Sequence, residues 1–91
     1  MAEAVIMPHK GESVESCVFS EWFVKKGEKV SKGDLLFAYE TDKSVFEQEA
    51  LADGILLETF VKEGDEIPVL EVIAVIGSEG ESVDEFRPVK S

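Results

Sequence analysis

Short runs of apolar residues, broken by turn residues, set the pattern of this chain. Six runs rich in Val, Ile, Leu and Phe have the length of β-strands, and two shorter extended pieces are expected at 29–30 and 66–67. Helical periodicity is weak throughout, so we expect an all-β sandwich or flattened barrel. The six predicted strands are 4–7, 17–24, 35–41, 45–49, 55–61 and 72–76, and the predicted turn glycines are Gly11, Gly27, Gly33, Gly54, Gly64 and Gly77.

The chain also repeats itself at an offset of 37 residues. Residues 24–30 align with residues 61–67 without a gap, and the similarity extends to 17–40 against 54–77. Each copy runs strand, glycine-acidic turn, short strand, strand. One such half-sheet cannot bury its apolar face alone, so we expect the two copies to pack on each other.

One lysine has a distinctive place in this pattern. Lys43 lies in Glu40-Thr41-Asp42-Lys43-Ser44, a short polar interruption between two apolar runs, and such an interruption predicts a β-hairpin. A lysine at a hairpin tip stays in water, without the burial that a catalytic lysine base requires. It is better suited as a handle that another protein grips and modifies. Asp42 and Ser44 are expected to bond to the turn backbone and fix its shape.

The composition limits the partners and the compartment. The chain has 91 residues, enough for one domain, and its 20 Asp and Glu against 9 Lys and Arg give a formal net charge of −11. This charge argues against nucleic acid and anionic membrane surfaces and favours partners with basic surfaces. No apolar run has the length of a membrane span, and no signal-peptide pattern is present. With one cysteine, Cys17, the chain cannot form an internal disulfide, and we expect a reducing compartment such as the bacterial cytoplasm or the mitochondrial matrix.

The sequence gives little support for a catalytic site or a metal site. There is no evident nucleophile–base pair and no phosphate-binding glycine loop, so the domain is not expected to be an enzyme by itself. Cys17 heads an apolar run and is expected to be packed, while His9 beside Pro8 is expected in a loop. One histidine and one cysteine are too few ligands for a metal site. Trp22 and most of the phenylalanines are expected in the core.

Together these features resemble the lipoyl domain of the 2-oxo acid dehydrogenase complexes, within the biotinyl/lipoyl attachment family. The resemblance covers about residues 3–78. It rests on the Asp-Lys pair of the hairpin, the turn glycines Gly27 and Gly54 on either side, the internal repeat, and the segment Met7-Pro8-His9-Lys10-Gly11-Glu12-Ser13. It implies two four-stranded antiparallel sheets related by a quasi-two-fold axis, with the lysine hairpin at one end and the termini at the other. It also implies a lipoyl domain at 1–78, and the polar residues 79–91 are expected to begin an interdomain linker.

The resemblance implies that lipoic acid is joined by an amide to Lys43 and acts as a swinging arm. A lipoate ligase or lipoyltransferase would attach it. A thiamin-diphosphate-dependent 2-oxo acid decarboxylase would load an acyl group, an acyltransferase domain would pass it to coenzyme A, and dihydrolipoyl dehydrogenase would reoxidise the arm. The chain is expected to be the N-terminal domain of the dihydrolipoamide acyltransferase subunit, with a lipoyl domain fused to the dihydrolipoyl dehydrogenase subunit as the alternative.

Other proteins that share this fold are alternatives to a lipoyl domain, and the resemblance also implies a docking surface. Biotin carriers share the fold but typically flank their lysine with methionines, where this chain has Asp42 and Ser44. The glycine-cleavage carrier protein is longer, with additional helical segments. An unmodified docking module of the same fold is a further alternative, although it would not need Asp-Lys at a tight tip. In lipoyl domains the loop after the first strand lies near the lysine, so the expected docking residues are Lys10, Glu12 and Ser13.

Overall fold

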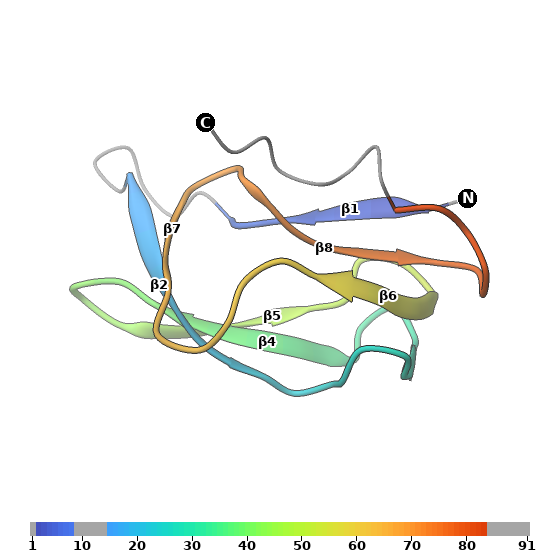
Figure 1. Cartoon of the computed structure of the whole chain (residues 1–91). Coiled ribbons are helices and arrows are strands. Elements are labelled where there is room, and N and C mark those ends of the chain that lie inside the picture. The colour runs from blue at the N-terminus through green and yellow to red at the C-terminus, as the bar shows by residue number, and fades with distance from the viewer. Residues whose placement is uncertain (1, 9–14, 84–91) are drawn as a thin grey trace.

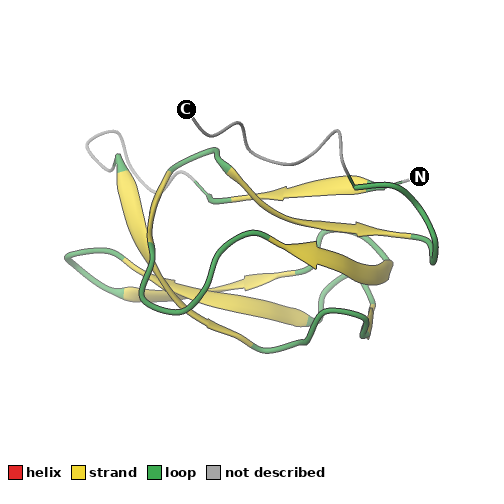
Figure 2. Cartoon of the chain, viewed as in Figure 1, coloured by secondary structure: helices red, strands yellow, loops and turns green. Residues whose placement is uncertain are grey.

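The computed structural model describes residues 2–8 and 15–83, and within these residues the chain forms eight strands and no helix (Figures 1 and 2). The all-β prediction is therefore confirmed. The strands are β1 (Glu3–Ile6), β2 (Ser16–Trp22), β3 (Lys29–Val30), β4 (Leu35–Glu40), β5 (Val45–Glu49), β6 (Gly54–Thr59), β7 (Glu66–Pro68) and β8 (Val72–Gly77).

Two of the predicted strands end two residues earlier than expected, and they do so in the same way. β2 ends at Trp22 and β6 ends at Thr59, each two residues before the predicted end. In both places the next residues still bond to a neighbouring strand, Phe23 N–H to Leu36 at 2.9 Å and Phe60 N–H to Ile73 at 2.8 Å. The chain then leaves the sheet for the glycine turn.

The strands form two four-stranded antiparallel sheets that pack as a flattened sandwich (Figure 1). One sheet has the order β1-β8-β6-β3 and the other has the order β5-β4-β2-β7. Exchanging β1 with β5, β8 with β4, β6 with β2 and β3 with β7 converts one order into the other. The sheets are therefore related by the quasi-two-fold axis that the resemblance implied.

The repeat extends to individual hydrogen bonds. Gly27 N–H donates to the carbonyl of Leu56 at 2.7 Å, and its equivalent Gly64 donates to the carbonyl of Phe19 at 2.8 Å. Both glycines have a positive φ, 94° and 91°, and lie in turns as predicted. The equivalent strand pairs β2 with β4 and β6 with β8 also carry their register shifts at equivalent positions.

The two copies do not form separate half-sheets, which corrects the expectation from sequence. β2 and β4 of the first copy lie in one sheet, but β3 of the same copy pairs with β6 in the other. In the second copy β7 likewise pairs with β2. The glycine turns carry the chain from one sheet to the other, so each copy supplies the short edge strand of its partner's sheet.

Aromatic residues of β2 and β4, the two central strands of one sheet, fill much of the core. Phe19, Phe37 and Tyr39 are fully buried, and the rings of Phe19 and Phe37 stack at 5.5 Å. Trp22 is half-buried and donates its indole N–H to the carbonyl of Val61 at 3.3 Å. Cys17 is buried, as predicted.

Gly54 is not a turn residue, contrary to the prediction. It is the first residue of β6 and pairs with Val30 of β3. Its φ is 153°, and a methyl group at this position would lie 2.9 Å from the carbonyl oxygen of Gly77. The site requires glycine because two strands approach closely. Gly77 was also predicted in a turn, but it is the last residue of β8; Gly11 lies outside the described residues.

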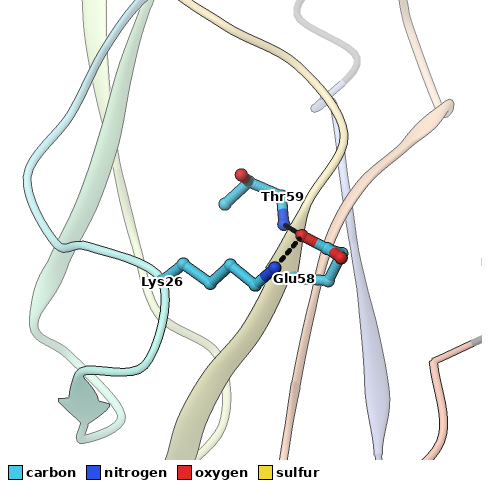
Figure 3. Close-up of polar contacts among 3 residues, drawn as sticks. All are labelled: Lys26, Glu58 and Thr59. Carbon is cyan, nitrogen blue, oxygen red and sulfur yellow. Dashed lines mark hydrogen bonds and ion pairs between the residues drawn. The ribbon is translucent and has the colours of Figure 1, made fainter.

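Polar contacts join the copies and the two ends of the described chain. Lys26, in the turn after β2, forms an ion pair at 3.0 Å with Glu58 of β6, and the same carboxylate oxygen accepts the N–H of Thr59 (Figure 3). Such a half-exposed pair adds little stability. The carboxylate of Glu81 accepts the N–H of Ala2 at 2.9 Å. Residues up to 81 therefore still contact the start of the domain.

Candidate functional site

The predicted hairpin is present, and Lys43 is exposed at its tip. β4 ends at Glu40 and β5 begins at Val45, and these two residues pair directly. The loop 41–44 is closed by the N–H of Thr41, which donates to the carbonyl of Ser44 at 2.9 Å. This leaves Asp42 and Lys43 as a two-residue tip. Within the described residues, the ammonium group of Lys43 has no ion-pair partner.

The side chain that bonds to the turn backbone is Thr41, rather than Asp42 or Ser44 as expected. Its hydroxyl accepts the N–H of Lys43 at 3.2 Å and donates to the carbonyl of Ser44 at 3.4 Å. No side-chain hydrogen bond of Asp42 or Ser44 is found in the described part of the chain. The available signal was the hydroxyl two residues before the lysine, the spacing of a local side-chain turn.

The base of the hairpin packs against the hydrophobic core. Tyr39 and Phe46 face each other across β4 and β5, immediately below the tip, and their rings stack at 5.5 Å. Phe19 pairs with Tyr39 on the other side. Because Tyr39 and Phe19 are buried and Phe46 packs against the core, the base of the hairpin is fixed while its tip is in water. The geometry holds the lysine backbone in place and leaves its side chain free to be modified.

The hairpin lies at one end of the sandwich, and the start of β1 and the end of β8 lie at the other (Figure 1). Glu3 pairs with Ile76 there. The ends of the described chain therefore do not crowd the lysine. This is the arrangement that the resemblance implied.

Acidic residues flank the lysine and continue along the hairpin. Glu40 and Asp42 are exposed at the tip, Glu47 is exposed further along β5, and Glu49 is exposed at the far end of that strand, opposite Leu35. An amide on Lys43 would remove one positive charge and make the formal net charge one unit more negative than −11. The surface that a partner meets at this end is therefore anionic.

The expected docking residues Lys10, Glu12 and Ser13 lie outside the described residues, and their role remains a prediction. His9 lies outside them as well. In residues 2–8 and 15–83 no group of three His, Cys, Asp or Glu side chains could hold a metal ion. Over the same residues, no helix is long and apolar enough to cross a membrane.

Two buried groups titrate above their usual range. Burial raises the pKa of the Cys17 thiol above its ordinary value of 9.0. Burial also raises the pKa of Tyr39 above 10.0, with the nearby Cys17 as a second cause. A buried thiol with a raised pKa is a poor nucleophile. Cys17 is thus a packing residue, as its place in an apolar run predicted.

A family model described as "Biotin-requiring enzyme" matches residues 3–76. Because this model covers both biotin- and lipoyl-bearing domains, individual relatives are needed to separate the two. The dihydrolipoyllysine-residue acetyltransferase component of the pyruvate dehydrogenase complex of Zymomonas mobilis is 38% identical over 86 residues, which are 93% of this chain and 20% of that protein. The corresponding component of the acetoin cleaving system of Bacillus subtilis is also 38% identical, over 93% of this chain and 21% of that protein.

A third relative has a different kind of name. The pyruvate dehydrogenase E1 component subunit beta of Rhizobium meliloti is 32% identical over 100% of this chain and 20% of its own length. The chain thus spans about a fifth of the length of the curated relatives that it matches.

Among solved structures, the lipoyl domain of the 2-oxoglutarate dehydrogenase complex of Azotobacter vinelandii superimposes with a TM-score of 0.67 at 32% identity. The match covers 85% of this chain and 100% of that domain. The relatives therefore agree with the hairpin flanks, which disfavour biotin. With a family match over almost all of the described strands and a lipoyl domain as structural neighbour, this chain belongs to the biotinyl/lipoyl attachment family as a lipoyl domain.

Proposed function

We propose that Lys43 is the lipoyl attachment site and that the domain is the acyl carrier of a 2-oxo acid dehydrogenase complex. The observation that carries the proposal is the position of Lys43, which is exposed at the tip of a closed hairpin and has no ion pair with any described residue. An ammonium group that is free in this way is accessible to a ligase. The residues around it fit a lipoyl amide, because none of them has to be displaced.

Bound lipoate would supply a disulfide that opens to an acyl thioester and a thiol, gives the acyl group to coenzyme A, and closes again on loss of two electrons and two protons. The protein supplies position. Thr41 and the closed loop 41–44 hold the backbone of Lys43, and the rings of Tyr39 and Phe46 fix the hairpin base. Glu40 and Asp42 stay in water beside the arm and attract basic partner surfaces. Tethering raises the concentration of the acyl group at each active site.

We further propose that the parent chain is a dihydrolipoamide acyltransferase subunit of a bacterial complex, with pyruvate as the first substrate to test. The names of the Zymomonas and Bacillus relatives support this assignment. The partners would be a lipoate ligase or lipoyltransferase, a thiamin-diphosphate-dependent decarboxylase, the acyltransferase domain with coenzyme A, and dihydrolipoyl dehydrogenase. The lipoyl domain would occupy 1–78, and 79–91 would begin the linker, although Glu81 still bonds to Ala2.

A decarboxylase β subunit is the second candidate for the parent chain. The Rhizobium relative with that name matches the whole of this chain. The carrier role of Lys43 would be the same in either parent. The two candidates differ only in which catalytic domain follows, so the sequence downstream of residue 91 distinguishes them.

The first test is the intact mass of the domain, with peptide mapping, after incubation with lipoate, ATP and a lipoate ligase. A single lipoyl increment on Lys43 is expected. A parallel reaction with biotin and a biotin ligase should give no increment. A biotinyl increment, or a folded domain that takes neither group, would overturn the proposal in favour of a biotin carrier or an unmodified docking module.

A further inference from the structure

A row of exposed side chains crosses the outer face of one sheet beside the lysine hairpin. Val18 of β2 pairs with Glu66 of β7 on one side and with Glu40 of β4 on the other, and Glu40 pairs with Val45 of β5. Side chains that are directly opposite in antiparallel strands point to the same face. We call these four residues, Glu66, Val18, Glu40 and Val45, the valine patch.

The valine patch faces solvent because the next row faces the core. Phe19, Tyr39 and Phe46 follow or precede the patch residues by one position and are paired in the same order, and their rings lie inside the sandwich. Alternation along each strand then turns the patch outward. Val18 is 38% exposed and Val45 is 58% exposed, so both valines offer apolar surface to a partner.

The charged residues of the valine patch and of the next outward-facing row are all acidic. Within it, Glu66 and Glu40 flank Val18. The next outward-facing row pairs Glu21 with Ala38 and Ala38 with Glu47. Neither row contains a lysine or an arginine. Apolar side chains set among carboxylates are complementary to an apolar depression bordered by basic residues.

The quasi-two-fold axis relates the valine patch to an equivalent row in the other sheet, and that row is partly covered by the chain itself. The equivalent row in the other sheet is Lys29, Ile55 and Gly77. There Glu81 packs over Gly77, so that a methyl group on Gly77 would lie 2.7 Å from its Oε1 atom. Glu81 thus covers the Gly77 end of this row, whereas Val18 and Val45 of the valine patch are exposed.

We propose that the valine patch is a docking surface for the decarboxylase that loads the arm. The inference rests on the proposed function and adds to it the surface and the chemistry of the partner. A ligase must bring the Lys43 amine itself into its active site, so its contacts concentrate at the tip. A decarboxylase has to reach only the far end of the arm, so it needs further contacts on the body of the domain to distinguish this domain from others. The valine patch provides them next to the hairpin.

The test compares Val18→Lys with Leu35→Lys. Leu35 is 45% exposed and lies at the far end of β4 from Glu40, so both variants change the net charge equally at exposed apolar strand positions. Each variant is first lipoylated completely, as verified by intact mass. Reductive acylation is then measured with whichever decarboxylase component, specific for pyruvate, 2-oxoglutarate or acetoin-derived substrate, acylates the wild-type domain.

We expect Val18→Lys to lower kcat/KM by about tenfold or more, mainly through KM, and Leu35→Lys to change it by less than about twofold. The milder Val18→Thr, which keeps the shape and the β-branch, should give a smaller loss in the same direction. Equal kcat/KM for the two lysine variants would overturn the inference. So would a defect of Val18→Lys that is confined to the lipoylation step, because the valine patch would then serve the ligase. A wild-type domain that is not lipoylated, or not acylated once lipoylated, would overturn the proposed function instead.

Discussion

Gly54 and Gly77 lie on neighbouring strands so close together that a methyl group on Gly54 would come within 2.9 Å of the Gly77 carbonyl oxygen. The same methyl group would be 3.0 Å from the side chain of Ile76. Backbone and a buried strand residue therefore both oppose any side chain at this position. The close approach occurs where β3 joins the sheet through its pairing with Gly54.

Gly54→Ala is expected to destabilise the domain by about 2–4 kcal/mol, because it adds a steric clash to an unfavourable φ. Gly27→Ala is the matched control. Gly27 also has a positive φ, but a methyl group there would meet nothing within 4 Å, so the cost should be about 1–2 kcal/mol. Urea unfolding followed by tryptophan fluorescence measures both. Equal losses for the two variants would contradict the close-packing argument.

Lys43→Arg is expected to keep the fold and abolish lipoylation and acyl acceptance, because arginine cannot form the lipoyl amide. Lys43 is exposed and has no ion pair in the described structure, so stability should change by less than about 0.5 kcal/mol. Intact mass after ligase treatment and reductive acylation are the measurements. Acylation of the arginine variant would refute the assignment of Lys43.

Exchanging Asp42 and Lys43 should leave the fold intact and prevent modification. Both residues are exposed at the tip, so the exchange keeps composition and charge and moves the amine by one position on the turn. We expect this result because a ligase recognises the lysine by its place on the closed hairpin. Efficient lipoylation of the shifted lysine, detected by peptide mapping, would show that position on the turn does not matter.

Thr41→Val should loosen the hairpin. Valine keeps the shape of threonine but loses the hydroxyl that bonds to Lys43 N–H and Ser44 C=O. The expected cost is about 0.5–1.5 kcal/mol, together with a slower ligase reaction. Thr41→Ser keeps the hydroxyl and should remain close to wild type in both measurements. If valine and serine behave alike, the hydroxyl does not organise the tip.

Stability should fall in alkaline solution because of Cys17 and Tyr39. Their folded-state pKa values are raised above the ordinary 9.0 and 10.0, so the folded chain holds these protons more tightly than the unfolded chain. The resulting stabilisation is complete below these ordinary values and is lost as the pH rises through the raised values. Urea midpoints at about pH 8 and about pH 10.5 should show the loss.

Tyr39→Phe is the control for the alkaline loss, since general charge repulsion would be the same in both proteins. The tyrosine hydroxyl is buried and has no hydrogen-bond partner in the described structure, so the variant should not be less stable near neutral pH. It should lose less stability than wild type on going to high pH. An identical loss in both proteins would mean that Tyr39 does not contribute.

The strands and the hairpin could be predicted from sequence because they depend on local pattern. Alternating apolar residues and glycine spacing predicted all eight strands, and the polar interruption at 40–44 predicted the exposed lysine. The spacing of Thr41 made it one candidate for bonding to the turn, but the choice among it and its neighbours could not be predicted. Thr41, Asp42 and Ser44 all have side chains that bond to turn backbones, and which one does so depends on dihedral angles that the sequence does not give.

Two features depend on the whole fold and have no local signal. A two-residue strand such as β3 shows nothing in its sequence that assigns it to one sheet or the other. Leu70 adopts a φ of 69° at the position equivalent to Gly33, whose φ is 98°. Leucine rarely takes this conformation, so its own preference predicts the wrong backbone. The quasi-two-fold path of the chain imposes it.

The exchange of short strands between the two copies has a consequence for the origin of the domain. β3 completes the sheet of the second copy and β7 completes that of the first. In a chain with a single copy, the short strand would have no sheet to join and the sheet would lack its short edge strand. Such a half-length chain could meet both requirements by giving its short strand to a second identical chain and receiving one in return. The domain has the architecture of a strand-swapped homodimer whose two subunits have become one polypeptide, with the hairpin at 41–44 as the connection between them.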